Sequence, residues 1–211
     1  MSTTFKNSLR GLYLVTPDWD DTERLLAITE QACRGGARIV QYRHKTASQE
    51  QRVEQATALL KLCRAHAVPL IINDHVDLCL RLDADGIHVG GKDLGVAQVR
   101  AQIGAEKILG ASCYGDWDLA LSAQAAGASY VAFGGFYPSL VKKYPVTTPM
   151  SIVQQAKSQL HVPNVVIGGM TVENSRVLIE AGADMVAAIS SVYLSENPEL
   201  EAQRFADLFN S

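Results

Sequence analysis

Short apolar segments alternate eight times with segments of helical periodicity along the 211 residues, and this alternation constrains the fold more than any other feature. Each apolar segment is too short for a helix and is bounded by residues such as Asn, Asp, Gly or Pro, which is typical of buried strands. The predicted strands are 11–15, 38–42, 69–72, 85–89, 107–112, 130–133, 164–167 and 185–189. The predicted helices are 22–33, a long helix capped by Ser48, 75–81, 96–103, 118–126, 150–159, 172–181 and 198–209.

Strands that alternate with helices predict a parallel sheet, and eight such units indicate an α/β fold closed as a (β/α)8 TIM barrel. A doubly wound open sheet is the alternative, which is disfavoured because no GxGxxG motif follows the first strand. No change of composition marks a linker, so we expect residues 1–211 to form a single TIM-barrel domain.

The composition argues against several classes of partner. A formal net charge of -3 gives no reason to expect nucleic acid or an anionic membrane. The N-terminal residues lack the apolar core of a signal peptide, and no stretch is long enough to span a membrane. The four cysteines form no CxxC pair, so we expect buried free thiols in a reducing compartment. These features predict a cytoplasmic protein.

The stretch 69–93 carries the strongest chemical signal. Its first apolar run ends in Asn73 and Asp74, and its second is followed by Asp93. Active sites of TIM barrels lie at the C-terminal ends of the strands, so Asp74 and Asp93 are expected to face each other across one mouth. Mg2+ usually takes one or two protein carboxylates together with substrate phosphate oxygens. The pair therefore predicts a magnesium site; capping of the helix at His75 is the other role open to Asp74.

Candidate anion-binding groups follow other predicted strands. Gln41, Arg43 and Lys45 occupy alternate positions, so they share one face if the second strand continues. Arginine and lysine supply charges suited to phosphate oxygens; a solvated strand end is the alternative. The long loop 134–148 carries Ser139 and Lys142 and is expected to cover a ligand, although it could be a surface excursion.

A phosphate site is expected beyond the last two strands. Gly168 and Gly169 precede the helix 172–181, and Ser190 and Ser191 follow the eighth strand. TIM barrels commonly bind phosphate here through backbone N–H groups. The mouth as a whole suits two substrates, one with a diphosphate and one with a phosphate.

Several motifs in order resemble the thiamine phosphate synthase family over nearly the whole chain. The most specific are QYRHK (41–45), close to the family's Gln-Leu-Arg-Glu-Lys, and IINDHVDLCLRLDADGIHVGGKDL (71–94). The others are LGAS, YVAFGGFYPS and VVIGGMTVENSRVLIEAGAD. The resemblance implies Mg2+-dependent transfer of a hydroxymethylpyrimidine group from its diphosphate to the nitrogen of a thiazole phosphate, which gives thiamine phosphate and diphosphate.

The resemblance also implies a role for particular residues. The pyrimidine diphosphate would be held by Gln41, Arg43, Lys45 and Asn73, with Ser112 lining the pyrimidine pocket and Lys142 touching the diphosphate. Mg2+ would be bound by Asp74 and Asp93, and the thiazole phosphate by Gly169, Ile189 and Ser190, with Ser139 and Val141 in the loop. The catalytic set would be Arg43, Lys45, Ser112 and Lys142.

The sequence departs from the family pattern in three motifs. The family's Thr-x-Thr-Lys reads Ser139-Leu140-Val141-Lys142, so one hydroxyl is lost at Val141. His44 replaces a glutamate and is expected to point away from the mouth in a neutral surface role, and Gly91 replaces a glutamine.

Other functions stay open at this point. A thiazole tautomerase could use His44 as its base, and a non-catalytic protein could bind thiamine precursors. A sugar-phosphate epimerase is less consistent, because only His88 lies near a strand end and a packed histidine is its default role. An apolar outer helix face would permit a homodimer.

Overall fold

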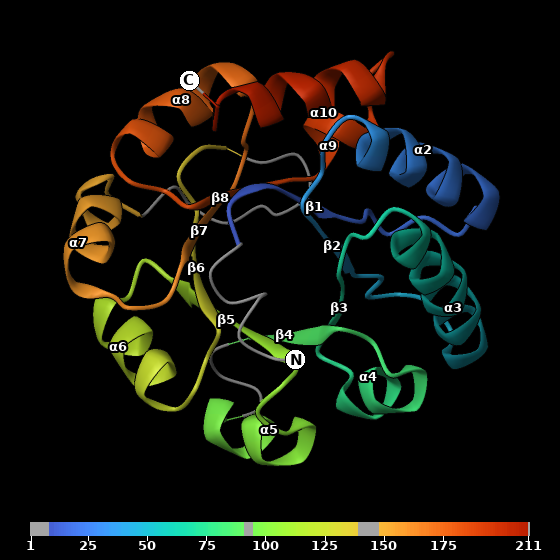
Figure 1. Ribbon diagram of the computed structural model, residues 1–211, viewed down its shortest axis with the longest axis horizontal. Helices are drawn as coiled ribbons and strands as arrows, with labels where there is room; N and C mark the ends of the chain where they lie inside the picture. Colours follow the sequence, from blue (N-terminus) through green and yellow to red (C-terminus); the bar gives the residue numbers. More distant parts are fainter. Residues whose placement is uncertain (1–8, 91–94, 139–147, 211) are drawn as a thin grey trace.

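The computed structural model describes residues 9–90, 95–138 and 148–210, in which strands and helices alternate as predicted (Figure 1). The strands are β1 (Gly11–Val15), β2 (Ile39–Tyr42), β3 (Leu70–Asn73), β4 (Gly86–Gly90), β5 (Ile108–Tyr114), β6 (Tyr130–Gly134), β7 (Asn164–Ile167) and β8 (Met185–Ala188). The helices are α2 (Thr22–Arg34), α3 (Gln49–Ala65), α4 (Val76–Leu82), α5 (Val96–Ile103), α6 (Trp117–Ala125), α7 (Ser151–Gln159), α8 (Val172–Glu180), α9 (Ser190–Tyr193) and α10 (Pro198–Asp207).

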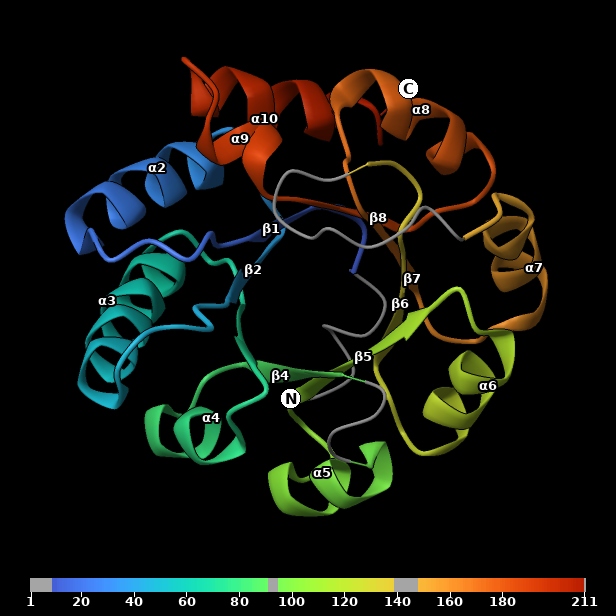
Figure 2. The same cartoon turned by 180° about the vertical axis from the view of Figure 1, so that it is seen from behind.

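The strands form a closed barrel in sequence order. Each strand is parallel to its neighbours, and β8 returns to pair with β1, with Leu12 opposite Val186. The helices encircle the barrel, and α10 lies between α8 and α2 (Figures 1 and 2). The predicted TIM barrel is confirmed, and the open-sheet alternative is wrong.

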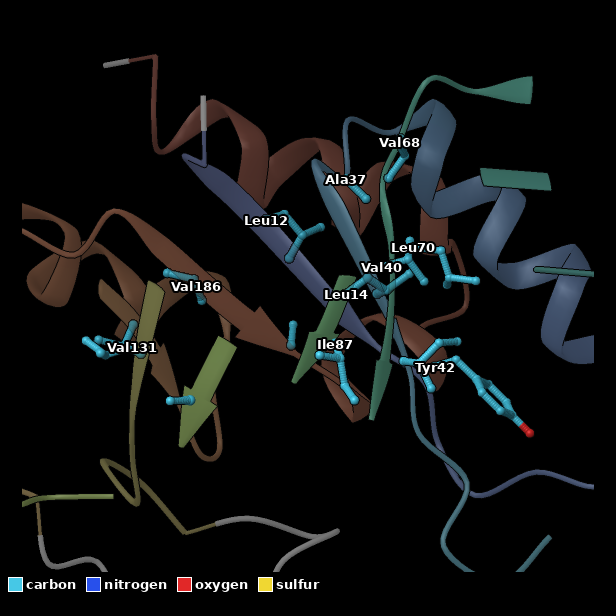
Figure 3. Close-up of a cluster of buried hydrophobic side chains, with 14 of the residues drawn as sticks. Leu12, Leu14, Ala37, Val40, Tyr42, Val68, Leu70, Ile87, Val131 and Val186 are labelled. Atoms are coloured by element: carbon cyan, nitrogen blue, oxygen red, sulfur yellow. The ribbon is translucent and has the colours of Figure 1, made fainter. Parts of the chain in front are cut away.

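The core has two parts because successive residues of a strand point to opposite faces. Outward-facing side chains such as Leu14, Val40 and Leu70 pack in the layer between the strands and the helices (Figure 3). Inward-facing side chains such as Tyr13 and Tyr130 form a second cluster, which fills the barrel. The barrel is therefore a packed core with a floor on which a ligand can rest.

Side-chain caps fix where several helices begin. Ser48 accepts a hydrogen bond from the Gln51 N–H at 3.1 Å, as predicted for the start of α3. Thr171 and Asn174 form a reciprocal capping box at the start of α8. These caps define the connections that follow β2 and β7, both of which reach the mouth.

Two details differ from the predicted elements. The short helix α9 was not predicted, because four residues are too few to show helical periodicity. Strand β5 continues past Ser112 to Tyr114, where its pairing with β6 shifts register.

All four cysteines are free and buried, as predicted. Among the residues described, no helix has the length and apolar character needed to cross a membrane.

Candidate functional site

Every strand contributes to the floor of the barrel mouth, a cavity of about 50 Å³. The lining residues are Tyr13, Val15, Gln41, Asn73, His88, Ser112, Ala132, Val165, Ile167 and Ala187. Three of them, Gln41, Asn73 and Ser112, were predicted from the sequence to bind substrate. The structure therefore brings these three side chains to one cavity.

A chain of hydrogen bonds crosses this floor. The Gln41 amide donates to the Tyr13 hydroxyl at 2.7 Å, and the Tyr13 and Tyr130 hydroxyl oxygens are 2.6 Å apart. The Tyr130 hydroxyl lies 3.0 Å from Nδ1 of His88, whose Nε2 lies 2.8 Å from Oγ of Ser112. Burial raises the pKa values of Tyr13 and Tyr130 above the usual range of tyrosine, so both hydroxyls are neutral. We refer to these five residues as the floor chain.

A second cavity, of about 230 Å³, lies beside the floor. It is lined by Tyr42, His44, Lys45, Arg52, Asn73, Asp74 and His75, which come from the ends of β2 and β3 and from the connections and helix that follow. Asn73 lines both cavities. One ligand could therefore place a ring on the floor and an anionic group in this side cavity.

Asp74 has a conformation that suits a ligating residue. Its φ of 63° is left-handed, and its N–H donates to the carbonyl oxygen of His88 at 2.9 Å. The Asn73 amide donates to Oδ2 at 2.6 Å, and the Gly90 N–H donates to Oδ1 at 3.4 Å. The N-cap of α4 is His75, without a side-chain hydrogen bond, so the capping role considered for Asp74 is wrong.

The oxygen donors at Asp74 fit a magnesium ion, which needs few protein carboxylates when substrate phosphate supplies other ligands. The described residues contain no cluster of three or more His, Cys, Asp or Glu side chains for a metal. The other predicted ligand, Asp93, lies outside the described residues, as do Ser139, Val141 and Lys142.

Arg43 and Lys45 do not share a face with Gln41, because β2 ends at Tyr42. The Arg43 guanidinium is buried and lies 3.2 Å from both carboxylate oxygens of Asp18, which also accepts a hydrogen bond from the Lys45 N–H at 2.9 Å. The Lys45 side chain lines the side cavity. Asp18 was not predicted as a site residue, although it follows the first strand.

Arg52 was also missed by the sequence reasoning. It donates through Nη2 to the carbonyl oxygen of Ala47 at 2.9 Å, but its buried Nε has no hydrogen-bond partner among the described residues. Within the described ranges, no carboxylate forms an ion pair with it. Its position in the first turns of a helix that follows a barrel strand was the available signal. Arg52 lines the side cavity.

The predicted surface role of His44 is wrong. The side chain is buried, with 4% of the residue exposed. Nδ1 lies 3.2 Å from Oε1 of Gln55, which also accepts a hydrogen bond from the Tyr42 hydroxyl. A buried histidine is accommodated here because Gln55 of α3 offers its Nδ1 a hydrogen-bond partner.

The predicted phosphate residues lie at the ends of β7 and β8, which are adjacent strands. Gly169 has a φ of 61°, and a Cβ there would lie 2.1 Å from the carbonyl oxygen of Pro138. Ile189 and Ser190 begin α9, whose first N–H groups have no partner within the helix. That these residues bind a phosphate stays a prediction.

Comparisons with known proteins show which family this chain belongs to. The model of a family described as thiamine monophosphate synthase matches residues 12–192. The thiamine-phosphate synthase of Janthinobacterium sp. (strain Marseille) is 65% identical over 204 residues, covering 97% of this chain and 99% of that protein. The thiamine-phosphate synthase of Nitrosospira multiformis is 44% identical over 204 residues, covering 97% of this chain and 87% of that protein.

Solved structures show the same architecture. Thiamine phosphate pyrophosphorylase from Pyrococcus furiosus has a TM-score of 0.84 and 27% identity, covering 98% of each chain. The (S)-3-O-geranylgeranylglyceryl phosphate synthase of Thermoplasma acidophilum has a TM-score of 0.73 at 20% identity, covering 99% of this chain and 98% of that one, and shares the fold.

Proposed function

The chain belongs to the thiamine monophosphate synthase family, and we propose that it joins hydroxymethylpyrimidine diphosphate to thiazole phosphate, with release of diphosphate. Family membership makes it a transferase that produces thiamine phosphate. The observation that carries this conclusion is the 65% identity to a thiamine-phosphate synthase over 97% of this chain.

The pyrimidine diphosphate spans the two cavities in our proposal. The ring rests on the floor between Gln41 and Ser112, both of which line that cavity. The diphosphate occupies the side cavity, where Lys45 and Arg52 supply positive charge. The substrate thus extends from the floor into the side cavity and passes Asn73, which lines both cavities. Lys142, outside the described residues, would touch the diphosphate as the family resemblance implies.

The chemistry requires charge stabilisation more than a protein nucleophile. The bond between the pyrimidine methylene carbon and the diphosphate oxygen breaks, and the electron pair leaves with the diphosphate. The thiazole nitrogen then donates its lone pair to that carbon, so the positive charge passes to the new thiazolium ring. Positively charged side chains at the side cavity stabilise the leaving group as its charge grows.

Arg43 acts differently from Lys45 in this proposal. Its guanidinium is held by Asp18, so it orders the β2–α3 connection from which Lys45 reaches the side cavity. Mg2+ would be held by Asp74 and Asp93, and when bound it would neutralise charge on the diphosphate.

The second substrate binds at the ends of β7 and β8. Backbone N–H groups near Gly169, Ile189 and Ser190 hold the thiazole phosphate, with Ser139 and Val141 in the loop that follows β6. The loss of one hydroxyl at Val141 is expected to weaken thiazole phosphate binding by about ten- to a hundredfold, the effect of one hydrogen bond to a charged group.

We also propose a cytoplasmic location, which the four buried free cysteines support. A homodimer stays a prediction, for which exposed Leu194 and Leu200 offer apolar surface.

The test is an assay of thiamine phosphate formation from the two purified substrates, with and without Mg2+. We expect metal-dependent product, and a fall of at least about a hundredfold for Asp74→Asn, because the metal's stabilisation of the leaving group is lost. Asparagine tolerates the left-handed backbone at this position, so the change removes charge without adding strain. The matched control is Asp77→Asn on the exposed side of α4, which should leave the rate unchanged. Full turnover in EDTA would rule out the metal-dependent mechanism.

A further inference from the structure

The floor chain joins Gln41 to Ser112, the two residues that the proposed function places against the pyrimidine ring. Its three middle members, Tyr13, Tyr130 and His88, are buried and were not predicted as site residues. Each link is within hydrogen-bond distance.

The direction of the chain follows from the donors available. The Gln41 amide nitrogen can only donate, so the Tyr13 oxygen accepts. The Tyr13 hydroxyl then donates to the Tyr130 oxygen. The reverse direction would leave the Tyr13 hydrogen buried without an acceptor, at a cost of about 1–3 kcal/mol.

The same reasoning sets the tautomer of His88. Because the Tyr130 hydroxyl donates to Nδ1, that nitrogen carries no hydrogen. A neutral imidazole then carries its hydrogen on Nε2, which donates to Oγ of Ser112. With its oxygen accepting from His88, Ser112 has its own hydrogen left to donate to a ligand on the floor.

Packing holds the chain in this arrangement. The rings of His88 and Tyr130 stack at 5.7 Å, and those of Tyr13 and Tyr130 meet edge to face at the same separation. Gly110 of β5 provides the space: a Cβ there would lie 2.2 Å from the Tyr130 hydroxyl oxygen and 2.6 Å from Nδ1 of His88. The contacts leave little freedom for the rings to turn.

We propose that Tyr13, Tyr130 and His88 are positioning residues that fix Ser112 as a hydrogen-bond donor, so that the floor selects a heteroaromatic ring with an acceptor nitrogen facing Ser112. This inference rests on the proposed function, because it takes the pyrimidine diphosphate as the ligand. It goes further in assigning the polarity of the contact and the residues that set it.

The experiment compares two substitutions of His88, which separate its role as acceptor at Nδ1 from its role as donor at Nε2. His88→Gln keeps a donor near the position of Nε2, whereas His88→Asn keeps a group near Nδ1 and loses the donor to Ser112. Equilibrium binding is measured for the pyrimidine diphosphate and for two analogues, in each of which CH replaces one ring nitrogen.

We expect the wild-type protein to bind one of the two analogues about tenfold more weakly than the pyrimidine, as for loss of one hydrogen bond. His88→Gln should keep this discrimination, whereas His88→Asn should reduce it to within about twofold. Tyr130→Phe should also weaken the discrimination. Its effect on the binding free energy should not add to that of Ser112→Ala if both substitutions affect the same contact.

A matched control separates positioning from stability. Tyr193→Phe removes an equally buried hydroxyl, which lies 2.7 Å from Oγ1 of Thr29 and belongs to α9, outside the floor chain. It should lower the melting temperature without changing the discrimination. Should a His88 variant fail to fold, Ser112→Ala at the partly exposed end of the chain still tests the polarity: the wild-type preference must disappear.

Two outcomes would overturn the inference: equal binding of all three ligands by the wild-type protein, or unchanged discrimination in His88→Asn. The synthase assay keeps this result separate from the proposed function. Product without ring-nitrogen discrimination rejects the floor chain alone, whereas lack of product rejects the synthase activity.

Discussion

At the scale of single residues, two arginines near the mouth have different electrostatic surroundings. Arg43 is buried against Asp18, which compensates its charge. Arg52 lines the side cavity, and its buried Nε has no hydrogen-bond partner in the part of the chain that the structure describes. A cation without a compensating carboxylate is better placed to attract an anionic ligand. The sequence drew attention to Arg43 because it sits beside a strand, whereas the direction of Arg52 depends on how α3 packs.

Arg52→Gln should raise KM for the pyrimidine diphosphate about tenfold, because a hydrogen bond to a charged group contributes roughly 1.5–3 kcal/mol. KM for the thiazole phosphate should not change. Steady-state kinetics with each substrate varied in turn provide the measurement. The control is Arg64→Gln, since Arg64 is exposed near the other end of the same helix and donates to the Asp83 carbonyl oxygen. Equal effects of the two changes would exclude a specific role for Arg52.

His75 predicts a pH dependence of stability. Burial and then the nearby Arg52 charge lower the pKa of His75 from its ordinary value of 6.5. Unfolding therefore takes up a proton as the pH falls below 6.5, so the free energy of unfolding is greatest above that pH and declines toward the folded-state pKa. Urea unfolding at a series of pH values should show this decline, and His75→Asn should make it smaller. An identical profile in the variant would show that another group is responsible.

At the scale of elements, β5 carries both a candidate site residue and a glycine whose missing side chain leaves room for neighbouring rings. Ser112 ends the floor chain, and Gly110, two positions earlier on the same face, leaves room for Tyr130 and His88. The sequence predicted this strand because an apolar run is a local pattern, although it placed the end at Ser112 rather than Tyr114. It could not predict the role of Gly110, since the rings that fill its space come from β4 and β6.

Gly110→Ala should lower the free energy of unfolding by about 1–3 kcal/mol, the usual effect of overpacking a core. It should also weaken pyrimidine diphosphate binding, because the added Cβ displaces the floor chain. Thermal unfolding and equilibrium binding measure the two effects. The control is Gly95→Ala, where a Cβ would meet nothing within 4 Å. Normal binding by a well-folded Gly110→Ala protein would contradict this account.

At the scale of the whole molecule, the two ends of the described chain close the barrel together. β1 pairs with β8, and α10 packs on α2, where a Cβ on Gly35 would lie 2.2 Å from the Glu199 carbonyl oxygen. Eight alternating units were enough to predict this closure, because few other arrangements cover both faces of a parallel sheet. The cavities were less predictable, since they depend on how the connections after β2 and β3 fold back.

Phe205→Ala should destabilise the entire barrel, because this α10 side chain is fully buried in the outer core. The expected loss is about 3–5 kcal/mol, a large part of the stability of an ordinary domain. Urea unfolding should be followed by tryptophan fluorescence and by far-ultraviolet circular dichroism, with coinciding transitions if residues 1–211 are one domain. Leu200→Ala on the same helix, where the residue is 55% exposed, is the control and should change stability by less than about 1 kcal/mol. Separate transitions would indicate independently folding parts.

The burial of all four cysteines has a practical consequence for studying this mouth. Thiol reagents react with exposed thiolates, so the folded chain offers them little natural background. Met150, which is 41% exposed in the connection between β6 and α7, could be replaced by Met150→Cys to introduce one accessible thiol. A fluorophore attached there would sit beside the mouth and report the arrival of each substrate by its emission, with every native cysteine left in place.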